Sequence, residues 1–219
     1  MTDLRHRLVE VNGLKMHLAE QGEGPLVLLC HGFPETWYSW RHQLPCLAEA
    51  GFRAVAPDLR GYGGTDRPEG IDHYTILDLV GDIVGLLEVL NVDEAFIVGS
   101  DWGATIAWHA ALLRPDLFRG MVALGVPMMG QPPVPPTSIF PQTTEELFYS
   151  LYFQIAGLAE EEFEQDGRLT LRKILFSASG DSGPRKENHG TPNPFGMVSR
   201  KSGLLAPLPD PASLPSWLN

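Results

Sequence analysis

In the first part of the chain, some segments space their apolar residues as strands do, and others space them as helices do. Val9–Leu18 alternates apolar and polar residues on both sides of Asn12-Gly13, which predicts a β-hairpin with a tight turn. Leu26–Cys30 is apolar without a break, as expected of a strand covered on both faces. Three further strands are predicted at Arg53–Pro57, Ala95–Val98 and Met121–Leu124.

Helical patterns separate these strands. Thr36 is expected to cap a helix that ends near Gly51 and carries Trp37, Trp40, Leu44 and Leu47. Thr75-x-x-Asp78 has the spacing of a capping box, and the apolar residues from Ile76 to Leu90 share one face of the helix it opens. A third helix follows Val98 and ends at Pro115. Strands that alternate with helices predict an α/β fold, a mainly parallel sheet with helices on both faces.

The composition changes after about residue 130, which divides the chain into two predicted regions, 1–130 and 131–219. Residues 131–136 are rich in proline and cannot continue a helix or strand. Residues 144–178 are again helical in pattern, whereas residues 179–216 are rich in Gly, Pro and Ser and are expected to form loops.

The candidate chemistry lies between the strand at Ala95–Val98 and the helix that follows it. Gly99-Ser100-Asp101-Trp102-Gly103 has the Gly-x-nucleophile-x-Gly pattern of a nucleophile elbow, in which two glycines permit a tight turn. Asp101 occupies the apex, and a carboxylate nucleophile predicts an alkyl–enzyme ester formed by attack at an sp³ carbon. Ser100 is one position away from the apex, which argues against a serine hydrolase. A lone Gly-x-Asp-x-Gly is often only a turn, so the flanking strand and helix carry the prediction.

Charge and composition exclude several classes of partner. The formal net charge is −11, whereas nucleic acids and anionic membranes require a basic face. Neither a signal peptide nor a membrane-spanning run is recognisable, so the cytoplasm is the expected compartment. Cys30 and Cys46 are expected to be buried free thiols. No cluster of Cys and His residues suggests a metal site. No cofactor is expected.

Several segments together resemble the α/β-hydrolase superfamily, and within it the soluble epoxide hydrolases of plants and bacteria. The matching segments are His31-Gly32-Phe33-Pro34, Asp58-x-Arg60-Gly61-Tyr62-Gly63, the elbow, and Tyr149–Gln154 of a helical lid, followed by 171–179 and 214–218. The resemblance covers nearly the whole chain in the right order. It implies an α/β-hydrolase core over 1–130 and an incomplete lid over 131–219.

The resemblance also assigns roles to individual residues. It implies that Asp101 attacks an epoxide carbon, that Tyr149 supplies a proton to the epoxide oxygen, and that the backbone N–H groups of Phe33 and Trp102 form an oxyanion hole. The side chains of Phe33, Trp102, Tyr149 and Phe153 would contact a small apolar epoxide. His31 and Pro34 would support the oxyanion loop. Tyr152 competes for the role of Tyr149, and the aromatic residues could instead belong to the core.

The expected product is a vicinal diol, and the only other reactant is water. In the superfamily the acid and the histidine of the catalytic triad follow the lid, so we expect residues 1–219 to be an inactive or partial fragment that lacks the last strands of the sheet. The oligomeric state is left open. Two alternatives are a haloalkane or haloacid dehalogenase, which shares the aspartate nucleophile, and a noncatalytic ligand-binding relative.

Overall fold

The computed structural model describes residues 3–128, 130, 133–182 and 194–210. The chain divides into two compact units, Met1–Met129 and Gly130–Asn219. Each unit has its own hydrophobic core. The two units are therefore described separately.

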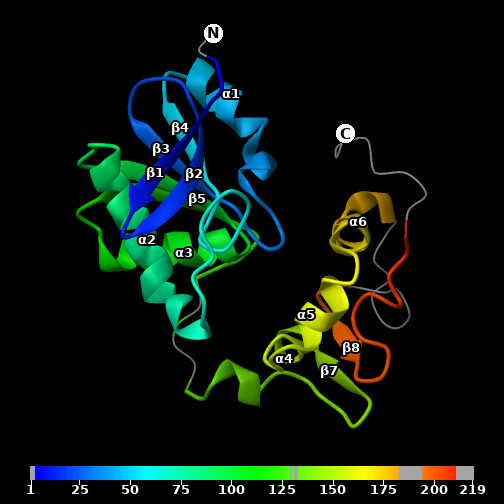
Figure 1. Cartoon of the computed structure of the whole chain (residues 1–219). Coiled ribbons are helices and arrows are strands. Elements are labelled where there is room, and N and C mark those ends of the chain that lie inside the picture. The colour runs from blue at the N-terminus through cyan, green and yellow to red at the C-terminus, as the bar shows by residue number, and fades with distance from the viewer. Residues whose placement is uncertain (1–2, 129, 131–132, 183–193, 211–219) are drawn as a thin grey trace. The chain divides into compact units, whose positions relative to one another are not determined.

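The first unit is built on a six-stranded mixed sheet (Figure 1). The strands lie in the order β1-β2-β4-β3-β5-β6; their bounds are Arg5–Val11 (β1), Leu14–Gln21 (β2), Leu26–Cys30 (β3), Arg53–Pro57 (β4), Ala95–Ser100 (β5) and Phe118–Leu124 (β6). The β1-β2 hairpin turns at Asn12-Gly13 and joins β4 antiparallel, whereas β4, β3, β5 and β6 run parallel. The predicted hairpin and the predicted mainly parallel sheet are both confirmed.

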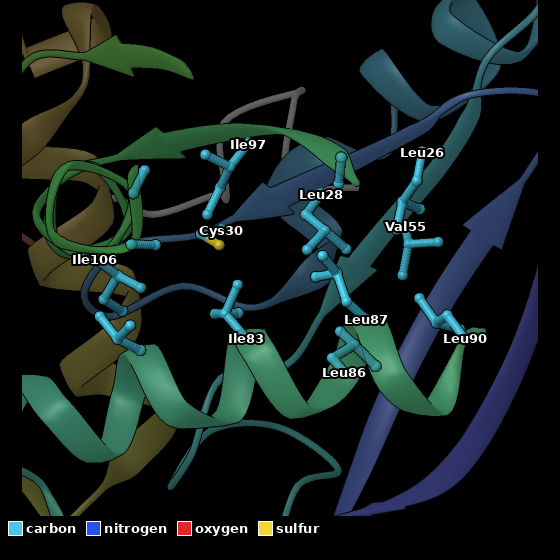
Figure 2. Close-up of a cluster of buried hydrophobic side chains, with 14 of the residues drawn as sticks. Leu26, Leu28, Cys30, Val55, Ile83, Leu86, Leu87, Leu90, Ile97 and Ile106 are labelled. Carbon is cyan, nitrogen blue, oxygen red and sulfur yellow. The ribbon is translucent and has the colours of Figure 1, made fainter. Parts of the chain in front are cut away.

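Strand β3 shows why its residues are apolar without a break. Leu26, Leu28 and Cys30 belong to the cluster that packs under α2 (Ile76–Val89) and α3 (Trp102–Leu113), and Figure 2 shows several members of this cluster. Val27 and Leu29 belong to a second cluster, beneath the 3₁₀ helix Trp37–Trp40 (η1) and α1 (Gln43–Glu49). Successive residues of a strand point to opposite faces, so both faces of the sheet are covered. Each fully buried Leu contributes about 1.5–3 kcal/mol to stability.

Helix α2 begins where the capping box predicts. The Thr75 hydroxyl accepts a hydrogen bond from the Asp78 backbone N–H, and the Asp78 carboxylate accepts one from the Thr75 N–H. Two of the N–H groups that a helix start leaves without partners are thereby satisfied. A short 3₁₀ helix, Ile71–His73 (η2), precedes it.

The segment after Thr36 differs from the single helix expected there. Thr36 does cap a helix, but that helix is the four-residue η1, and α1 starts separately at Gln43. Pro45 explains the break, because in a continuous helix its missing N–H and its ring would disrupt the turn before it, whereas the first turn of α1 tolerates it. The expectation that Cys46 is buried was also wrong: Cys46 is exposed and Cys30 is buried, and both are free thiols.

The second unit contains helices and a small sheet. The helices are α4 (Tyr149–Tyr152), α5 (Leu158–Phe163) and α6 (Gly167–Ala178), with short 3₁₀ turns at Pro136–Ser138 and Gly180–Ser182. Strands β7 (Glu146–Phe148) and β8 (Met197–Ser199) pair antiparallel, which corrects the predictions of helix at 146–148 and loop at 197–199. Leu147 and Val198 face each other across this pair and are buried in the core of the unit. The strands are too short to show a period of two in the sequence.

Strand β6 lies at one edge of the large sheet. Among the described residues it pairs with β5 alone. Two of its apolar side chains are about half exposed, Val122 at 51% and Leu124 at 46%. In the part of the chain that the structure describes, β6 is thus an edge strand with partly exposed apolar side chains.

Candidate active site

Asp101 occupies a sharp turn between β5 and α3. Its backbone has φ 53° and ψ −121°, a conformation that costs a non-glycine residue about 1–3 kcal/mol and is found mainly at functional sites. The turn requires close packing, because a Cβ on Gly103 would overlap the Cys30 carbonyl oxygen of β3. Residues 99–103 thus form the elbow geometry that their sequence predicts, with Asp101 at the apex.

The loop after β3 contacts the Asp101 carboxylate directly. The Phe33 backbone N–H donates a hydrogen bond to Asp101 Oδ1 over 2.9 Å. Gly32 lies against the Asp101 side chain so closely that a Cβ there would clash with it. Pro34 follows Phe33 and continues the loop. The loop therefore fixes one of the two carboxylate oxygens and orients the other.

His31 holds this loop in place by two hydrogen bonds to backbone groups. Leu59 N–H donates to His31 Nε2 over 3.0 Å, so Nε2 is unprotonated, and Nδ1–H donates to the Gly32 carbonyl oxygen over 2.9 Å. The side chain is fully buried, and this burial lowers the pKa of the imidazole. Both ring nitrogens are occupied, which suits a supporting residue and leaves neither available as a base.

Two aromatic side chains lie near the elbow. Trp102 is the first residue of α3, where a backbone N–H has no partner within the helix, and its side chain is 56% exposed. The Tyr62 ring packs edge-on against His31, with 5.0 Å between ring centroids. Burial, with a smaller contribution from the Asp101 charge, raises the pKa of Tyr62 to about 12. Tyr62 therefore remains a neutral phenol beside the carboxylate.

The predicted lid residues lie in the second unit. Tyr149 is half-buried and its ring contacts those of Phe148, Phe153 and Phe195. Tyr152, its competitor, is 2% exposed and donates its hydroxyl to Glu162 Oε2 over 2.6 Å. Burial, the hydrogen bond and the Glu162 charge raise the pKa of Tyr152. The Tyr152 hydroxyl is thus engaged inside the core of the unit.

The comparison with known families agrees with this geometry. Residues 25–217 match the family model described as the alpha/beta hydrolase fold. The chain belongs to this family. The α/β hydrolase is 43% identical over 218 residues to Epoxide hydrolase A of Mycobacterium tuberculosis (strain ATCC 25618 / H37Rv), covering 97% of this chain and 65% of that protein. It is 42% identical over 219 residues to Epoxide hydrolase 3 of Siraitia grosvenorii, covering 100% of this chain and 65% of the relative.

Solved structures give the same relationship. An epoxide hydrolase from an endophytic Streptomyces superposes on the α/β hydrolase with a TM-score of 0.91 and 43% identity, covering 99% of this chain and 64% of that one. Epoxide Hydrolase A from Mycobacterium thermoresistibile has a TM-score of 0.85 and 38% identity, covering 99% and 67%. The chain spans about 65% of the length of the curated relatives it matches.

Two carboxylates of the α/β hydrolase hold loop segments through backbone N–H groups, in ways the sequence did not reveal. Glu35 Oε2 accepts from the Gly32 N–H over 3.2 Å, and the Glu35 N–H donates to the Gly32 carbonyl oxygen over 3.0 Å, which closes the loop after β3. Asp58, at the end of β4, is buried and accepts from Trp37 N–H and Gly64 N–H. In the sequence, the role of Glu35 was indicated only by its position three residues after Gly32, which is the spacing of a turn.

The described residues contain no group of three or more His, Cys, Asp or Glu side chains placed to hold a metal ion together. In the same part of the α/β hydrolase, no helix has the length and apolar character needed to cross a bilayer.

Proposed function

We propose that this α/β hydrolase opens epoxides by nucleophilic attack of Asp101 on a ring carbon. The observation that carries the proposal is the 2.9 Å hydrogen bond from the Phe33 N–H to Asp101 Oδ1. It holds one carboxylate oxygen in the position of a future ester carbonyl, and it leaves Oδ2 as the attacking atom. The named epoxide hydrolases among the relatives support the same chemistry.

The first step forms a covalent ester. Asp101 Oδ2 forms a bond to the epoxide carbon as the ring C–O bond breaks, and the electron pair of that bond moves to the ring oxygen. This oxygen must take up a proton, because an alkoxide is a poor leaving group at neutral pH. We propose that the Tyr149 hydroxyl supplies the proton. The Tyr152 hydroxyl is less suited, because it is buried and already donates to Glu162.

The second step returns the carboxylate. Water attacks the ester carbonyl carbon, and the negative charge that develops on Oδ1 needs hydrogen-bond donors that are already in position. The Phe33 N–H already contacts this oxygen, and the Trp102 N–H at the start of α3 is the proposed second donor. In the family order, the acid and histidine that activate this water follow the lid. Ester formation needs Asp101, whereas diol release also needs the acid and the histidine. The two steps are therefore proposed separately.

We propose Phe33, Trp102, Tyr149 and Phe153 as the aromatic contacts for a small apolar epoxide. Phe33, Tyr149 and Phe153 are partly exposed, and Trp102 is more than half exposed. Accessible aromatic side chains suit an apolar substrate better than a charged one. We further propose that the protein acts in the cytoplasm.

Intact-mass spectrometry tests the proposal on the 219-residue chain. Incubation with an aryl epoxide should add one epoxide mass, and peptide mapping should place it on Asp101. Asp101→Asn should give no adduct, because an amide is a far weaker nucleophile than a carboxylate of the same shape. The mass of the variant must be checked first for deamidation back to aspartate.

A haloalkane of the same carbon skeleton separates the alternatives. An adduct from the epoxide alone supports the proposal. An ester formed from the haloalkane alone would make the protein a dehalogenase, and reversible binding of both compounds without an adduct would make it a ligand-binding relative.

A further inference from the structure

Two histidines far from Asp101 in sequence meet on the β1-β2 hairpin. His6 Nδ1 and His17 Nε2 lie 3.1 Å apart, and the planes of the two rings are within 10° of each other. His6 lies diagonally across from His17, because Leu8 is the residue paired with His17. Side chains two residues apart on a strand share a face, so both imidazoles point to the same side of the hairpin.

Asp58 fixes the second of these rings. His17 Nδ1–H donates to Asp58 Oδ2 over 2.8 Å, and the carboxylate is buried. The bond leaves His17 Nε2, the atom that faces His6, to carry a lone pair in the neutral ring. An imidazole whose far N–H is held by a carboxylate is the usual arrangement around metal-binding histidines.

We propose that His6 and His17 form a binding site for a late first-row divalent cation such as Zn²⁺ or Cu²⁺, with Asp58 as the positioning residue. The cation would take the place of the proton between the two nitrogens, and that proton would move to His6 Nε2, so that both rings bind as neutral imidazoles. Water would complete the coordination. Imidazole nitrogens are suitable ligands for these metals. The inference does not depend on the proposed epoxide chemistry.

The distance between the nitrogens is close to what such a site requires. Zn–N bonds of about 2.0–2.1 Å in a tetrahedral site place two imidazole nitrogens roughly 3.3 Å apart. The nitrogens need to separate by only a few tenths of an ångström, while one ring rotates so that both lone pairs point at the cation. His6 can make that movement because it is exposed, whereas His17 is 18% exposed and held by Asp58.

The surroundings tolerate the added charge. Arg5 and Arg7 flank His6 in sequence, but they lie on the opposite face of β1, where both pair with the buried Glu20 carboxylate. On the face of the histidines the nearest charged group is the Asp58 carboxylate, which attracts a cation. The Trp37 ring packs edge-on against His6 at 4.7 Å between centroids and limits the range of that side chain.

Calorimetric titration of the tag-free 219-residue chain with Zn²⁺ and with Cu²⁺ tests the site. We expect one cation per chain with micromolar affinity. His6→Asn and His17→Asn should each weaken binding at least tenfold. Asp58→Asn should weaken it by roughly ten- to a hundredfold while both ligands remain. His42→Asn, a change of another exposed histidine, is the matched control and should bind as the wild type does.

Electron paramagnetic resonance of the Cu²⁺ complex gives a second readout. The wild type should show hyperfine coupling to two imidazole nitrogens, and His6→Asn should show coupling to one. Because His6 is exposed, its variant is expected to fold even if the His17 and Asp58 variants do not. Absence of binding, or equal affinity of wild type and His6→Asn, would overturn the proposal. His6 and His17 would then be joined only by a hydrogen bond.

Discussion

Replacing His31 by alanine tests whether this histidine supports the active-site loop. The change removes an imidazole that joins the Leu59 N–H and the Gly32 carbonyl oxygen in the interior. Each buried group left without a partner costs about 1–3 kcal/mol, and the lost ring adds a cavity term. We expect the free energy of unfolding to fall by about 3–5 kcal/mol, a large part of the stability of a domain.

Urea unfolding followed by tryptophan fluorescence measures the stability of the first unit, which contains His31. Four of the five tryptophans, at positions 37, 40, 102 and 108, lie in the first unit. His31→Asn can keep a donor near the Gly32 carbonyl, and His31→Gln can keep an acceptor for the Leu59 N–H. Each should recover part of the loss, and His42→Ala should lose little because that side chain is exposed. An unchanged urea midpoint in His31→Ala would refute the argument.

The same residue predicts a pH dependence of stability. Burial lowers the pKa of folded His31 below its ordinary value of 6.5, so the unfolded chain takes up a proton first as the pH falls. The contribution of His31 is therefore complete above about pH 6.5 and declines below it, by at most about 1.4 kcal/mol per pH unit. The difference in the free energy of unfolding between wild type and His31→Asn, measured as a function of pH, separates the contribution of His31 from that of the other histidines. A difference that does not change below about pH 6.5 would contradict the assignment.

Three further predictions use other parts of the chain. Tyr149→Phe should slow formation of the Asp101 ester by roughly ten- to a thousandfold, measured by intact mass, because it removes an acid and leaves the ring; a larger defect in Tyr152→Phe would reverse the assignment. Asp82→Ala should lower the urea midpoint by the equivalent of about 3–5 kcal/mol, because a buried guanidinium then loses its bidentate partner. A thiol reagent should label the exposed cysteine of α1 and leave Cys30 unmodified in the folded protein, because burial raises the pKa of Cys30 to about 12; labelling of both thiols at the same rate would contradict the structure.

Features set by neighbouring residues were predictable from the sequence. The hairpin at Asn12-Gly13, the capping box at Thr75 and the elbow at Asp101 each depend on a few consecutive residues. The sheet type followed as well, because strands that alternate with helices have few ways to pack.

Features set by distant pairings were not predictable in this way. The β7-β8 pair joins segments that have no visible period in the sequence, and Leu147 and Val198 of the pair are buried in the core of the second unit. Motif position favoured Tyr149 over Tyr152, whereas the hydrogen bond from the Tyr152 hydroxyl to Glu162 is visible only in three dimensions. His6 and His17 appeared unrelated until the hairpin register brought them together.

The separate cores of the two units have an evolutionary consequence. The clusters that support β5, α3 and the loop at Gly32 take their members from Met1–Met129, whereas the cluster containing Leu147 and Tyr152 takes all of its members from Gly130–Asn219. The clusters therefore have no residue in common, and a substitution inside one of them removes no member of the other. The core of the second unit can therefore change its members without replacing any member of the clusters that support Asp101, so the two parts of the sequence can diverge at different rates.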